Sequence, residues 1–568
     1  MTFLSGIQAV IRSAADNRVG AVFGVPGSPV TAVVSAFKES PDFSNKTEWF
    51  VSEKIAFEWA LGYSFSGKRS LVVVKHVGMN VLADPLMTSM IHTIGAGIVI
   101  LAGDDPEVTG SQNSQDSRYY GSLSRSPVFD PSAPQEIYDY LTEAFSLSEK
   151  MKAPVIVRVT AAVLNEKSEV SSLDSGSAFE APADLKTDKS VWRYRMTGRY
   201  LRSHYVNDAI SEQAAASFCR IEEKEKSDSN SGSKFGIITS GYCYSRVQNV
   251  LKSVCEKKIS LAPENVSVLK LGVVSPPPVS QIRKFLEKHK TVLVVEESEP
   301  FIEDQIRVFG NVIGKRSGHL PFGSTTEAHV LLAIEKADSV SVPISTDIEM
   351  FKRPAGGPDF CGDSFYPLFY EMLGKLKEKT NLSVSGDIGC SMHGILEPYS
   401  VLDSAVSLGV AIGIGSGVSN NASASNNAGN KTINNIEYPK KSIAVIGDFG
   451  FFHSGLLSLA EAAEKGVSIL IYVMCNEKAA MTGGQSVYDP EELARAALKT
   501  GMNRNLNSVQ TFNFEISLKH ISSEKISTEK KSPEEVLKEN IQLLFEASFK
   551  EVKKEGISVI IVHWKCDS

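Results

Sequence analysis

Two apolar segments in the last third of the chain each end in a polar residue that could hold a metal ion. Ser442–Ile446 is followed by the sequence Gly-Asp-Phe-Gly at 447–450, and Ser468–Met474 is followed by Cys475-Asn476. A helical pattern separates the two segments, which predicts a right-handed strand–helix–strand unit with parallel strands. Parallel strands end at the same edge of a sheet, where ligands of open α/β sheets bind. We therefore expect Asp448 and Asn476 to lie close together.

The residue types at this edge suit Mg2+ and a diphosphate. Mg2+ prefers hard oxygen ligands and keeps coordination positions for phosphate oxygens. Asp448, Asn476 and the backbone carbonyl of Lys478 could supply such ligands, and Gly447 and Gly450 would let a diphosphate approach the backbone. Taken singly, a strand-end aspartate is more often a helix cap, and a strand-end asparagine a turn residue. The combined spacing favours the metal site.

The remaining segments predict the fold that must position these residues. Short apolar segments alternate with helical patterns, which is typical of an α/β fold of doubly wound units with parallel sheets. We expect a first unit at 1–165, a linker region at 166–234, a second unit at 235–340 and a third at 353–568. Within the third unit, the Asn-rich tract 420–435 is expected to be a disordered insertion, and Asn503–Lys531 an irregular loop.

Composition narrows the class of protein. A net charge of −7 over 568 residues gives no reason to expect nucleic-acid binding. No apolar run approaches a membrane span, and the first twenty residues lack a signal-peptide core, so we expect a cytoplasmic protein. The seven cysteines include no Cys-x-x-Cys pair. That spacing argues against a disulfide framework and against an iron–sulfur cluster on this chain.

Several segments resemble the alpha subunit of indolepyruvate:ferredoxin oxidoreductase, in the thiamine-diphosphate-dependent 2-oxoacid oxidoreductase family. The resemblance covers nearly the whole chain in order, apart from the Asn-rich tract and the polar loop. It is carried by Gly24-Val25-Pro26-Gly27-Ser28-Pro29, Lys75-His76-Val77-Gly78-Met79-Asn80, Ala83-Asp84-Pro85-Leu86-Met87, the segment 111–120, Gly386-Asp387-Ile388-Gly389-Cys390, Gly447-Asp448 with 451–455, and Ala480-Met481-Thr482-Gly483.

The resemblance implies an architecture and a set of cofactors. The first unit would be a pyrimidine-binding domain, the third a diphosphate-binding domain, and the middle unit a transketolase C-terminal-like domain. Thiamine diphosphate and Mg2+ would be the cofactors, held by a homodimer core. The family's cofactor-binding positions fall on Gly389, Cys390, Gly447, Asp448, Phe449, Asn476, Met481 and Thr482, and its metal ligands on Asp448, Asn476 and Lys478.

Four residues outside the third unit are candidate catalytic residues. Glu53 takes the place of the activating glutamate, which hydrogen-bonds the aminopyrimidine of the cofactor. Ser28 and Arg118 are candidates for holding the substrate carboxylate, and His76 could line the cleft. Each also has a plain structural interpretation: a first-turn helix acid, a turn hydroxyl, a surface ion pair and a buried histidine.

Two departures from the family bear on function. The chain stops at 564–568, near where the family's ferredoxin-like domain with its cysteines would begin, so we expect electrons to leave through other subunits. The segment Arg353–Asp363 keeps one cysteine, Cys361, of a Cys-x-x-Cys-x-His pattern. That loss puts the cofactor contacts of this segment in doubt.

The resemblance implies oxidative decarboxylation of a 2-oxo acid, with aryl pyruvates such as indolepyruvate as substrates. CoA would accept the acyl group, and a gamma- or beta-type subunit and a ferredoxin would be the partners. Two alternatives stay open. One is a non-oxidative decarboxylase that releases an aldehyde. The other is a non-catalytic partner subunit, against which the intact Glu53, Asp448 and Asn476 argue.

Overall fold

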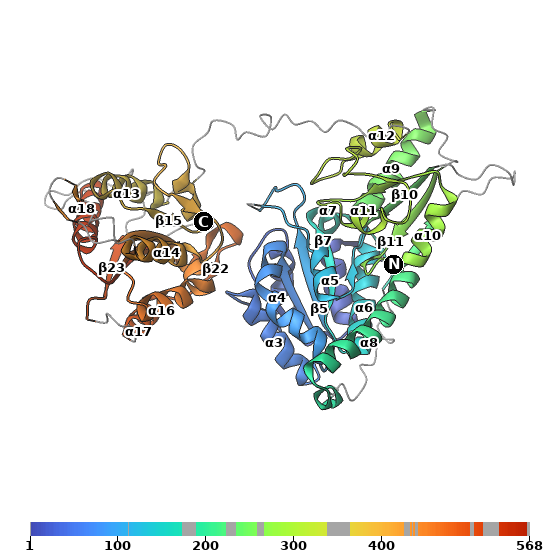
Figure 1. Ribbon diagram of the computed structural model, residues 1–568, viewed down its shortest axis with the longest axis horizontal. Helices are drawn as coiled ribbons and strands as arrows, with labels where there is room; N and C mark the ends of the chain where they lie inside the picture. The colour runs from blue at the N-terminus through green and yellow to red at the C-terminus, as the bar shows by residue number, and fades with distance from the viewer. Residues whose placement is uncertain are drawn as a thin grey trace. The chain divides into compact units, whose positions relative to one another are not determined.

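The computed structural model divides the chain into two compact units, Met1–Ile348 and Glu349–Ser568 (Figure 1). The residues that the structure describes are 2–111, 113–172, 189–222, 235–257, 266–337, 360, 364–424, 432–433, 436–437, 441–499, 505–514 and 533–564. The predicted α/β class is confirmed, because each unit is built on largely parallel sheets flanked by helices.

The first unit contains a seven-stranded sheet with the order β12-β6-β7-β5-β4-β2-β3. Neighbouring strands run parallel, except that β12 is antiparallel to β6. The central strands are rich in valine, isoleucine and leucine and are buried, as a sheet covered on both faces requires. The strands are β2 (Ala21–Gly24), β3 (Thr47–Trp49), β4 (Ser70–Lys75), β5 (Ile98–Asp104), β6 (Val128–Phe129), β7 (Val155–Thr160) and β12 (Val273–Ser275).

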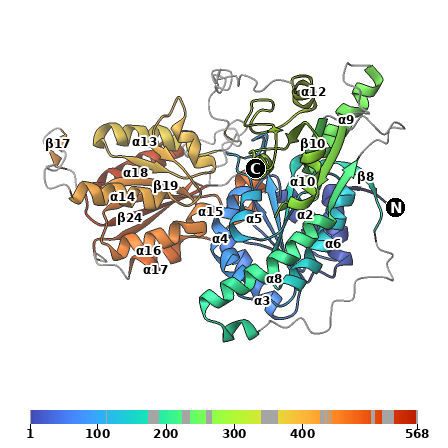
Figure 2. The same ribbon diagram turned by 45° about the vertical axis from the view of Figure 1, so that its right-hand side comes forward.

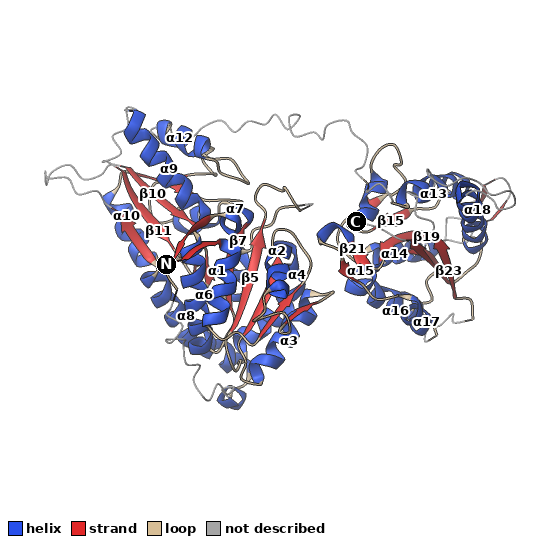
Figure 3. Ribbon diagram, turned by 180° about the vertical axis from the view of Figure 1, so that it is seen from behind, coloured by secondary structure: helices blue, strands red, loops and turns tan. Residues whose placement is uncertain are grey.

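Helices cover both faces of this sheet. The helices are α1 (Gly6–Asp16), α2 (Thr31–Glu39), α3 (Glu53–Phe65), α4 (His76–Ile91), α5 (Arg118–Ser124), α6 (Pro134–Met151) and α7 (Ala161–Asn165). α1 packs on α6, and α3 packs on α4. Right-handed crossovers place these two pairs on opposite faces, which Figures 1 and 3 show from the two sides. Four loops therefore emerge at the carboxyl ends of β2, β3, β4 and β5.

A second sheet in the same unit has the order β14-β13-β10-β11-β9. Its strands are β9 (Cys219–Glu222), β10 (Phe235–Ser240), β11 (Val266–Leu271), β13 (Thr291–Val295) and β14 (Val312–Ile313), and only β9 is antiparallel to its neighbour. Its helices are α9 (Gly241–Lys257), α10 (Val279–Lys288), α11 (Phe301–Ile306) and α12 (Glu327–Glu335). The chain leaves β11 and immediately forms β12 on the first sheet, so the two sheets belong to one folded body.

The region 166–234, which we expected to be a linker, contributes several elements to this unit. β8 (Lys167–Val170) pairs with β1 (Thr2–Ser5), and the 3-10 helix η1 (Lys189–Arg193) precedes α8 (Met196–Ser217). α8 packs on α4 and α6. The charged stretch after Glu222 lies outside the described residues. The limits predicted for the three units remain predictions.

The second unit is built on a fully parallel six-stranded sheet with the order β16-β15-β19-β20-β24-β23. Its strands are β15 (Val384–Gly386), β16 (Ser404–Ala405), β19 (Ser442–Gly447), β20 (Ile469–Cys475), β23 (Ser508–Phe514) and β24 (Ile557–Trp564). Two short ribbons, β17 (Thr432–Ile433) with β18 (Ile436–Glu437) and β21 (Lys478–Ala479) with β22 (Gln485–Ser486), lie outside this sheet.

Helices lie on both faces of this sheet (Figure 2), and an apolar core fills the space between the sheet and the helices on each face. One core lies under α13 (Tyr366–Thr380) and α18 (Pro533–Glu551), and the other under α14 (Ala411–Ala424), α16 (Leu456–Glu464) and α17 (Glu491–Leu498). A short helical turn α15 (Asp448–Gly450) and a π-turn η5 (Phe451–Gly455) lead from β19 directly into α16. The 3-10 helix η4 (Cys390–Ile395) follows β15.

Three sequence expectations concern segments of this unit. The interpretation of Asn503–Lys531 as an irregular loop is wrong for Ser508–Phe514, which forms the edge strand β23, while 515–531 lies outside the described residues. The expectation that the Asn-rich tract 420–435 is disordered is wrong for 420–424, which ends α14, and for 432–433, which forms β17. The rest of this tract and the cysteine-bearing segment at 361–363 lie outside the described residues. Among the helices that the structure describes, none is long and apolar enough to cross a membrane.

Candidate active site

The Asp448 carboxylate links the ends of β19 and β20. Gly447 pairs with Met474 across these strands, so Asp448 and Asn476 emerge side by side, as the sequence pattern predicts. Oδ1 of Asp448 accepts the Phe449 N–H at 2.7 Å, and Oδ2 accepts the N–H groups of Glu477 at 2.7 Å and Asn476 at 3.1 Å. Burial raises the pKa of Asp448 to about 6, although these N–H donors act to lower it.

The loop after β20 adds two further oxygen atoms of the kind that Mg2+ binds. Asn476 Oδ1 accepts the N–H of Lys478 at 3.3 Å, and Lys478 begins the ribbon of β21 with β22. No cluster of three or more His, Cys, Asp or Glu side chains suited to a metal occurs in the described parts of the chain. A metal at this edge would instead use one carboxylate, one amide oxygen and one backbone carbonyl. That donor set fits Mg2+, which keeps its remaining positions for phosphate or water.

The backbone next to Asp448 borders open space at two glycines, Gly447 and Gly389. A β-carbon added at Gly447 or at Gly389 would meet no atom within 4 Å, and Gly389 has a φ of 112° that favours glycine. Cys390 starts η4 and packs against the apolar core, and Phe449 is half-buried. Open space over two glycines at a strand–helix junction is suited to the close approach of an anion.

Met481 and Thr482 lie in the turn between β21 and β22. Met481 is 51% exposed. The Thr482 hydroxyl donates to the carbonyl of Ala479 at 3.3 Å. These contacts fix the turn, and the contact of both residues with a cofactor remains a proposal.

Asp387 is a buried acid that the sequence analysis did not single out. It follows β15, which pairs with β19, so the Gly-Asp dipeptides at 386–387 and 447–448 end neighbouring strands. Its Oδ1 accepts the Gly409 N–H at 2.6 Å, Oδ2 has no hydrogen-bond partner, and burial raises the pKa of the carboxyl to about 7. The repeated Gly-Asp dipeptide was the signal that could have identified it.

The position of Asp387 contradicts the expectation that Gly450 lets a diphosphate approach the backbone. A β-carbon at Gly450 would collide with Oδ2 of Asp387, so the glycine is required by a side chain of the same unit. It does not open space for a diphosphate. Of the two glycines in the Gly-Asp-x-Gly sequence, only Gly447 borders open space.

A pair of alanine variants separates these two roles. Gly450→Ala is expected to lower the free energy of unfolding of the second unit by about 1–3 kcal/mol, because the methyl group overpacks a buried site. Gly447→Ala should leave the stability of the cofactor-free protein within about 0.5 kcal/mol, since its methyl group meets nothing. Thermal unfolding of both variants checks this. Equal destabilisation by the two substitutions would contradict it.

A second polar group gathers at the carboxyl ends of β2, β3 and β4 in the first unit. Glu53 opens α3 and is buried. Gly78 in α4 lies against it, since a β-carbon there would be 2.6 Å from Glu53 Oε1. Ser28, in the turn after β2, lies so close to Gly110 that a β-carbon at Gly110 would collide with the Ser28 hydroxyl. The first contact joins the loop after β3 to α4, which follows β4, and the second joins the loops after β2 and β5.

His76 is fully buried at the start of α4, and neither ring nitrogen has a hydrogen-bond partner. Burial, reinforced by the neighbouring Lys75, lowers the pKa of the imidazole to about 4. His76 is therefore neutral at physiological pH. A buried, unpartnered imidazole is unusual for a purely structural residue, because buried polar groups are nearly always hydrogen-bonded.

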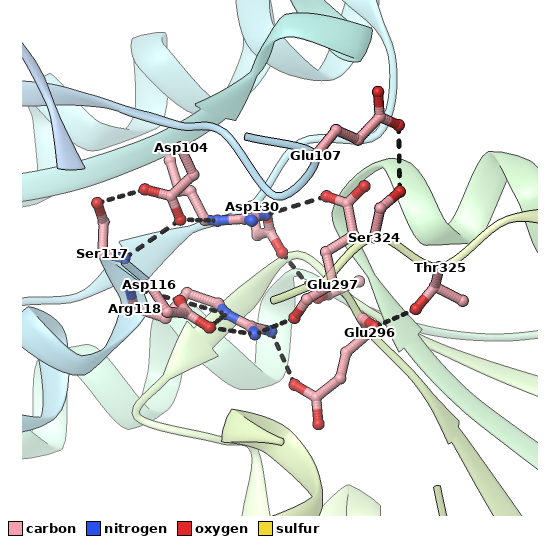
Figure 4. A network of polar contacts seen from close by, with 12 residues as sticks. Asp104, Glu107, Asp116, Ser117, Arg118, Asp130, Glu296, Glu297, Ser324 and Thr325 are labelled. Atoms are coloured by element: carbon pink, nitrogen blue, oxygen red, sulfur yellow. Dashed lines mark hydrogen bonds and ion pairs between the residues drawn. The ribbon is translucent and has the colours of Figure 1, made fainter. Parts of the chain in front are cut away.

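Arg118 does not belong to this group. Its Nε donates to Asp116 at 2.9 Å, Nη1 to Glu296 at 2.8 Å, and Nη2 to the carbonyls of Glu297 and Glu299 at 2.8 and 3.0 Å (Figure 4). The guanidinium is buried with two carboxylates beside it. Its hydrogen bonds therefore join the two sheets of the first unit. We no longer expect Arg118 to bind a substrate carboxylate.

A family of thiamine-diphosphate enzymes matches most of the second unit. Residues 387–562 match the family described as thiamine pyrophosphate enzyme, C-terminal TPP binding domain. This range contains the whole oxygen set at Asp448 and Asn476, together with Asp387 and Gly389.

Relatives extend the match to most of the chain. The indolepyruvate oxidoreductase subunit IorA of Methanothermobacter thermautotrophicus is 30% identical over 502 residues, which cover 85% of this chain and 76% of the relative. The IorA subunit of Pyrococcus horikoshii is 31% identical over 510 residues, covering 85% and 75%. This chain belongs to the family of indolepyruvate oxidoreductase subunit IorA, and the resemblance inferred from the sequence is confirmed.

A solved structure, the 2-oxoglutarate:ferredoxin oxidoreductase from Magnetococcus marinus with 2-oxoglutarate, coenzyme A and succinyl-CoA bound, covers 59% of this chain and 65% of its own at 13% identity, with a TM-score of 0.44.

Proposed function

We propose that this chain catalyses the thiamine-diphosphate-dependent oxidative decarboxylation of a 2-oxo acid, with aryl pyruvates such as indolepyruvate as substrates. The carboxylate leaves as carbon dioxide, the remaining acyl group is joined to the thiol of CoA, and the thiol proton is released. Two electrons pass to ferredoxin through partner subunits. A homodimeric core with a gamma- or beta-type subunit is the assembly proposed.

The observation that carries this proposal is the oxygen set at the ends of β19 and β20. Asp448, Asn476 and the Lys478 carbonyl would hold Mg2+, and the bare backbone at Gly389 and Gly447 would face the diphosphate. Thiamine diphosphate, when bound, supplies the electron sink for cleavage of the bond to the carboxylate. The names of the relatives support the choice of an aryl pyruvate.

The residues of the first unit would handle protons and the substrate. Glu53 would exchange a proton with the aminopyrimidine of the cofactor, a task that suits a buried carboxyl held in one place. Ser28 would donate a hydrogen bond to the substrate. Neutral His76 could accept or donate a hydrogen bond without adding charge.

The reaction type is tested by purifying the chain anaerobically with its partners and supplying Mg2+, thiamine diphosphate, CoA and indolepyruvate. Viologen reduction that requires CoA is the expected result. Formation of an aldehyde without viologen reduction would instead establish a non-oxidative decarboxylase. If neither activity accompanies measurable cofactor binding, the chain is a non-catalytic subunit.

Glu53→Gln is expected to reduce turnover by at least about 100-fold while thiamine diphosphate still binds, because the amide keeps the shape but cannot transfer the proton. Steady-state kinetics and calorimetric titration with the cofactor measure the two effects separately. Glu58→Gln is the matched control, since Glu58 lies on the same helix and is 47% exposed. Turnover close to that of the control variant would remove Glu53 from the mechanism.

A further inference from the structure

Lys75 is a cation without a partner at the edge of the first sheet. It is the last residue of β4, next to His76, and it is half-buried. Its aliphatic stem crosses Gly27, where an added β-carbon would be 2.7 Å from Lys75 Cδ. The side chain therefore runs along the turn that carries Ser28. Within the described parts of the chain, its ammonium group makes no hydrogen bond and no ion pair.

The other buried basic groups near this edge are already neutralised or uncharged. Arg118 is paired with Asp116 and Glu296. Arg158, in β7, is paired with Asp104 and Asp130. His76 is neutral because burial lowers its pKa to about 4. Among these buried and half-buried basic groups, Lys75 alone has charge available for a ligand.

The surroundings of Lys75 penalise its charge when no ligand is present. Burial lowers the pKa of Lys75 from its ordinary value, although Glu53 and Asp105 nearby act to raise it. Asp105 attracts the ammonium group from nearby but forms no hydrogen bond or ion pair with it among the described contacts. Its carboxylate accepts the N–H of Thr109 at 3.2 Å and the N–H of Gly110 at 2.8 Å, which holds its own loop. A substrate carboxylate would therefore give the Lys75 ammonium group an ion-pair partner that the described residues do not provide.

We propose that Lys75 binds the carboxylate of the 2-oxo acid, in the role that the sequence suggested for Arg118, and that this single cation selects monocarboxylic 2-oxo acids over dicarboxylic ones. This inference rests on the proposed function. Glu53 and Asp105 bring negative charge to the same edge, so a second substrate carboxylate would face repulsion without a second cation. An aryl or branched aliphatic side chain carries no such penalty.

The test is equilibrium binding of an unreactive carboxylate. Indole-3-propionate, which lacks the 2-oxo group, is titrated calorimetrically into the full chain loaded with Mg2+ and thiamine diphosphate. Lys75→Met is expected to weaken its binding by about 10- to 100-fold, the effect of losing one charged hydrogen bond. Lys75→Arg should retain part of the affinity. Binding of the neutral indole-3-propanol should be the same in all variants, which a general distortion of the site would not allow.

Two further measurements make the result specific. Affinity of the unmodified chain for indole-3-propionate should fall as pH rises through the lowered pKa of Lys75, because only the charged ammonium attracts the anion. Lys68→Met, at an exposed lysine of the same unit, should change neither affinity nor its pH dependence. In steady-state assays, indolepyruvate should be used with a kcat/KM at least about 10-fold above that of 2-oxoglutarate, and Lys75→Met should raise KM more than it lowers kcat.

Failure of the two proposals can be told apart. If thiamine diphosphate does not bind the unmodified chain, the proposed function is overturned and the role of Lys75 with it. If the cofactor binds but Lys75→Met binds indole-3-propionate as tightly as the Lys68→Met control, the role of Lys75 alone is overturned. Equal use of 2-oxoglutarate and indolepyruvate would overturn the selection of monocarboxylates.

Discussion

Replacing Asp448 with alanine is expected to abolish Mg2+-dependent binding of thiamine diphosphate, with a loss of affinity of at least about 100-fold. Removing an outer partner of a metal ligand already costs 10- to 100-fold in many sites, and a direct ligand should cost more. The carboxylate is the one charged member of the proposed oxygen set, so its loss leaves Mg2+ with two neutral oxygens from the protein. Calorimetric titration with the cofactor, with and without a chelator, measures the effect.

The same carboxylate also accepts three backbone N–H groups, so a loss of folding must be separated from a loss of metal binding. Thermal unfolding without cofactor reports the first effect, and titration well below the unfolding transition reports the second. Glu461→Ala is the matched control, because this acid lies on α16 of the same unit and is 66% exposed. A folded Asp448→Ala protein that binds the cofactor as tightly as the control would show that the metal lies elsewhere.

Local sequence pattern predicted the edge at Asp448 because every step depends on near neighbours in the chain. Two continuous apolar segments, each too short for a buried helix, bracket one helical pattern. The strands of such a unit run parallel, so their carboxyl ends share one edge of the sheet. The positions of Asp448 and Asn476 follow without knowledge of any distant contact. Glu53, at the start of a helix after β3, was instead singled out by the family resemblance.

The partner of Arg118 could not be predicted in this way. Asp116 is two residues away, but Glu296 is 178 residues away and belongs to the second sheet. No periodicity in the sequence predicts that the strand ends of the two sheets lie close together. The same limit applies to Gly450. Glycine is required there because the Asp387 carboxylate, which follows the neighbouring strand β15, would collide with a β-carbon.

The edge strand β23 shows a different limit. Its sequence, SVQTFNF, mixes polar and apolar residues without strict alternation, and most of its side chains are only half-buried. It lies beside a polar stretch, so composition favoured a loop. Its strand conformation depends on pairing with β24, from Ser508 opposite Ser558 to Phe514 opposite Trp564. Edge strands depend on such tertiary contacts more than on intrinsic propensity.

Arg158→Leu is expected to destabilise the first unit by about 3–5 kcal/mol, the usual cost of removing one partner from a buried ion pair. Arg158 Nε donates to Asp104 at 2.6 Å, and Nη1 donates to Asp130 at 3.0 Å. Asp130 in turn accepts the Ser240 hydroxyl at 2.7 Å, at the end of β10 in the second sheet. All these charged side chains are buried. The leucine variant leaves two carboxylates in the interior without a cation.

The consequence should be a lower melting temperature for the first unit, measured by calorimetry because a chain of two units need not unfold in one transition. Arg12→Leu is the matched control. Arg12 pairs with Asp16 one turn along α1 and its side chain is 40% exposed, so its loss should cost less than about 1 kcal/mol. A shift in the Arg158 variant no larger than in the control would contradict the prediction.

A compensating variant tests the cause of the destabilisation. Arg158→Leu combined with Asp104→Asn and Asp130→Asn removes the cation and both anions together. It should recover part of the lost stability, because uncompensated charge is the main penalty in the single variant. The ion pairs of Arg158 tie the carboxyl ends of β5 and β7 to the second sheet. The proposed substrate site with Lys75 lies instead at the carboxyl ends of β2, β3 and β4. If the triple variant were less stable than the single one, lost packing and not unpaired charge would be the cause.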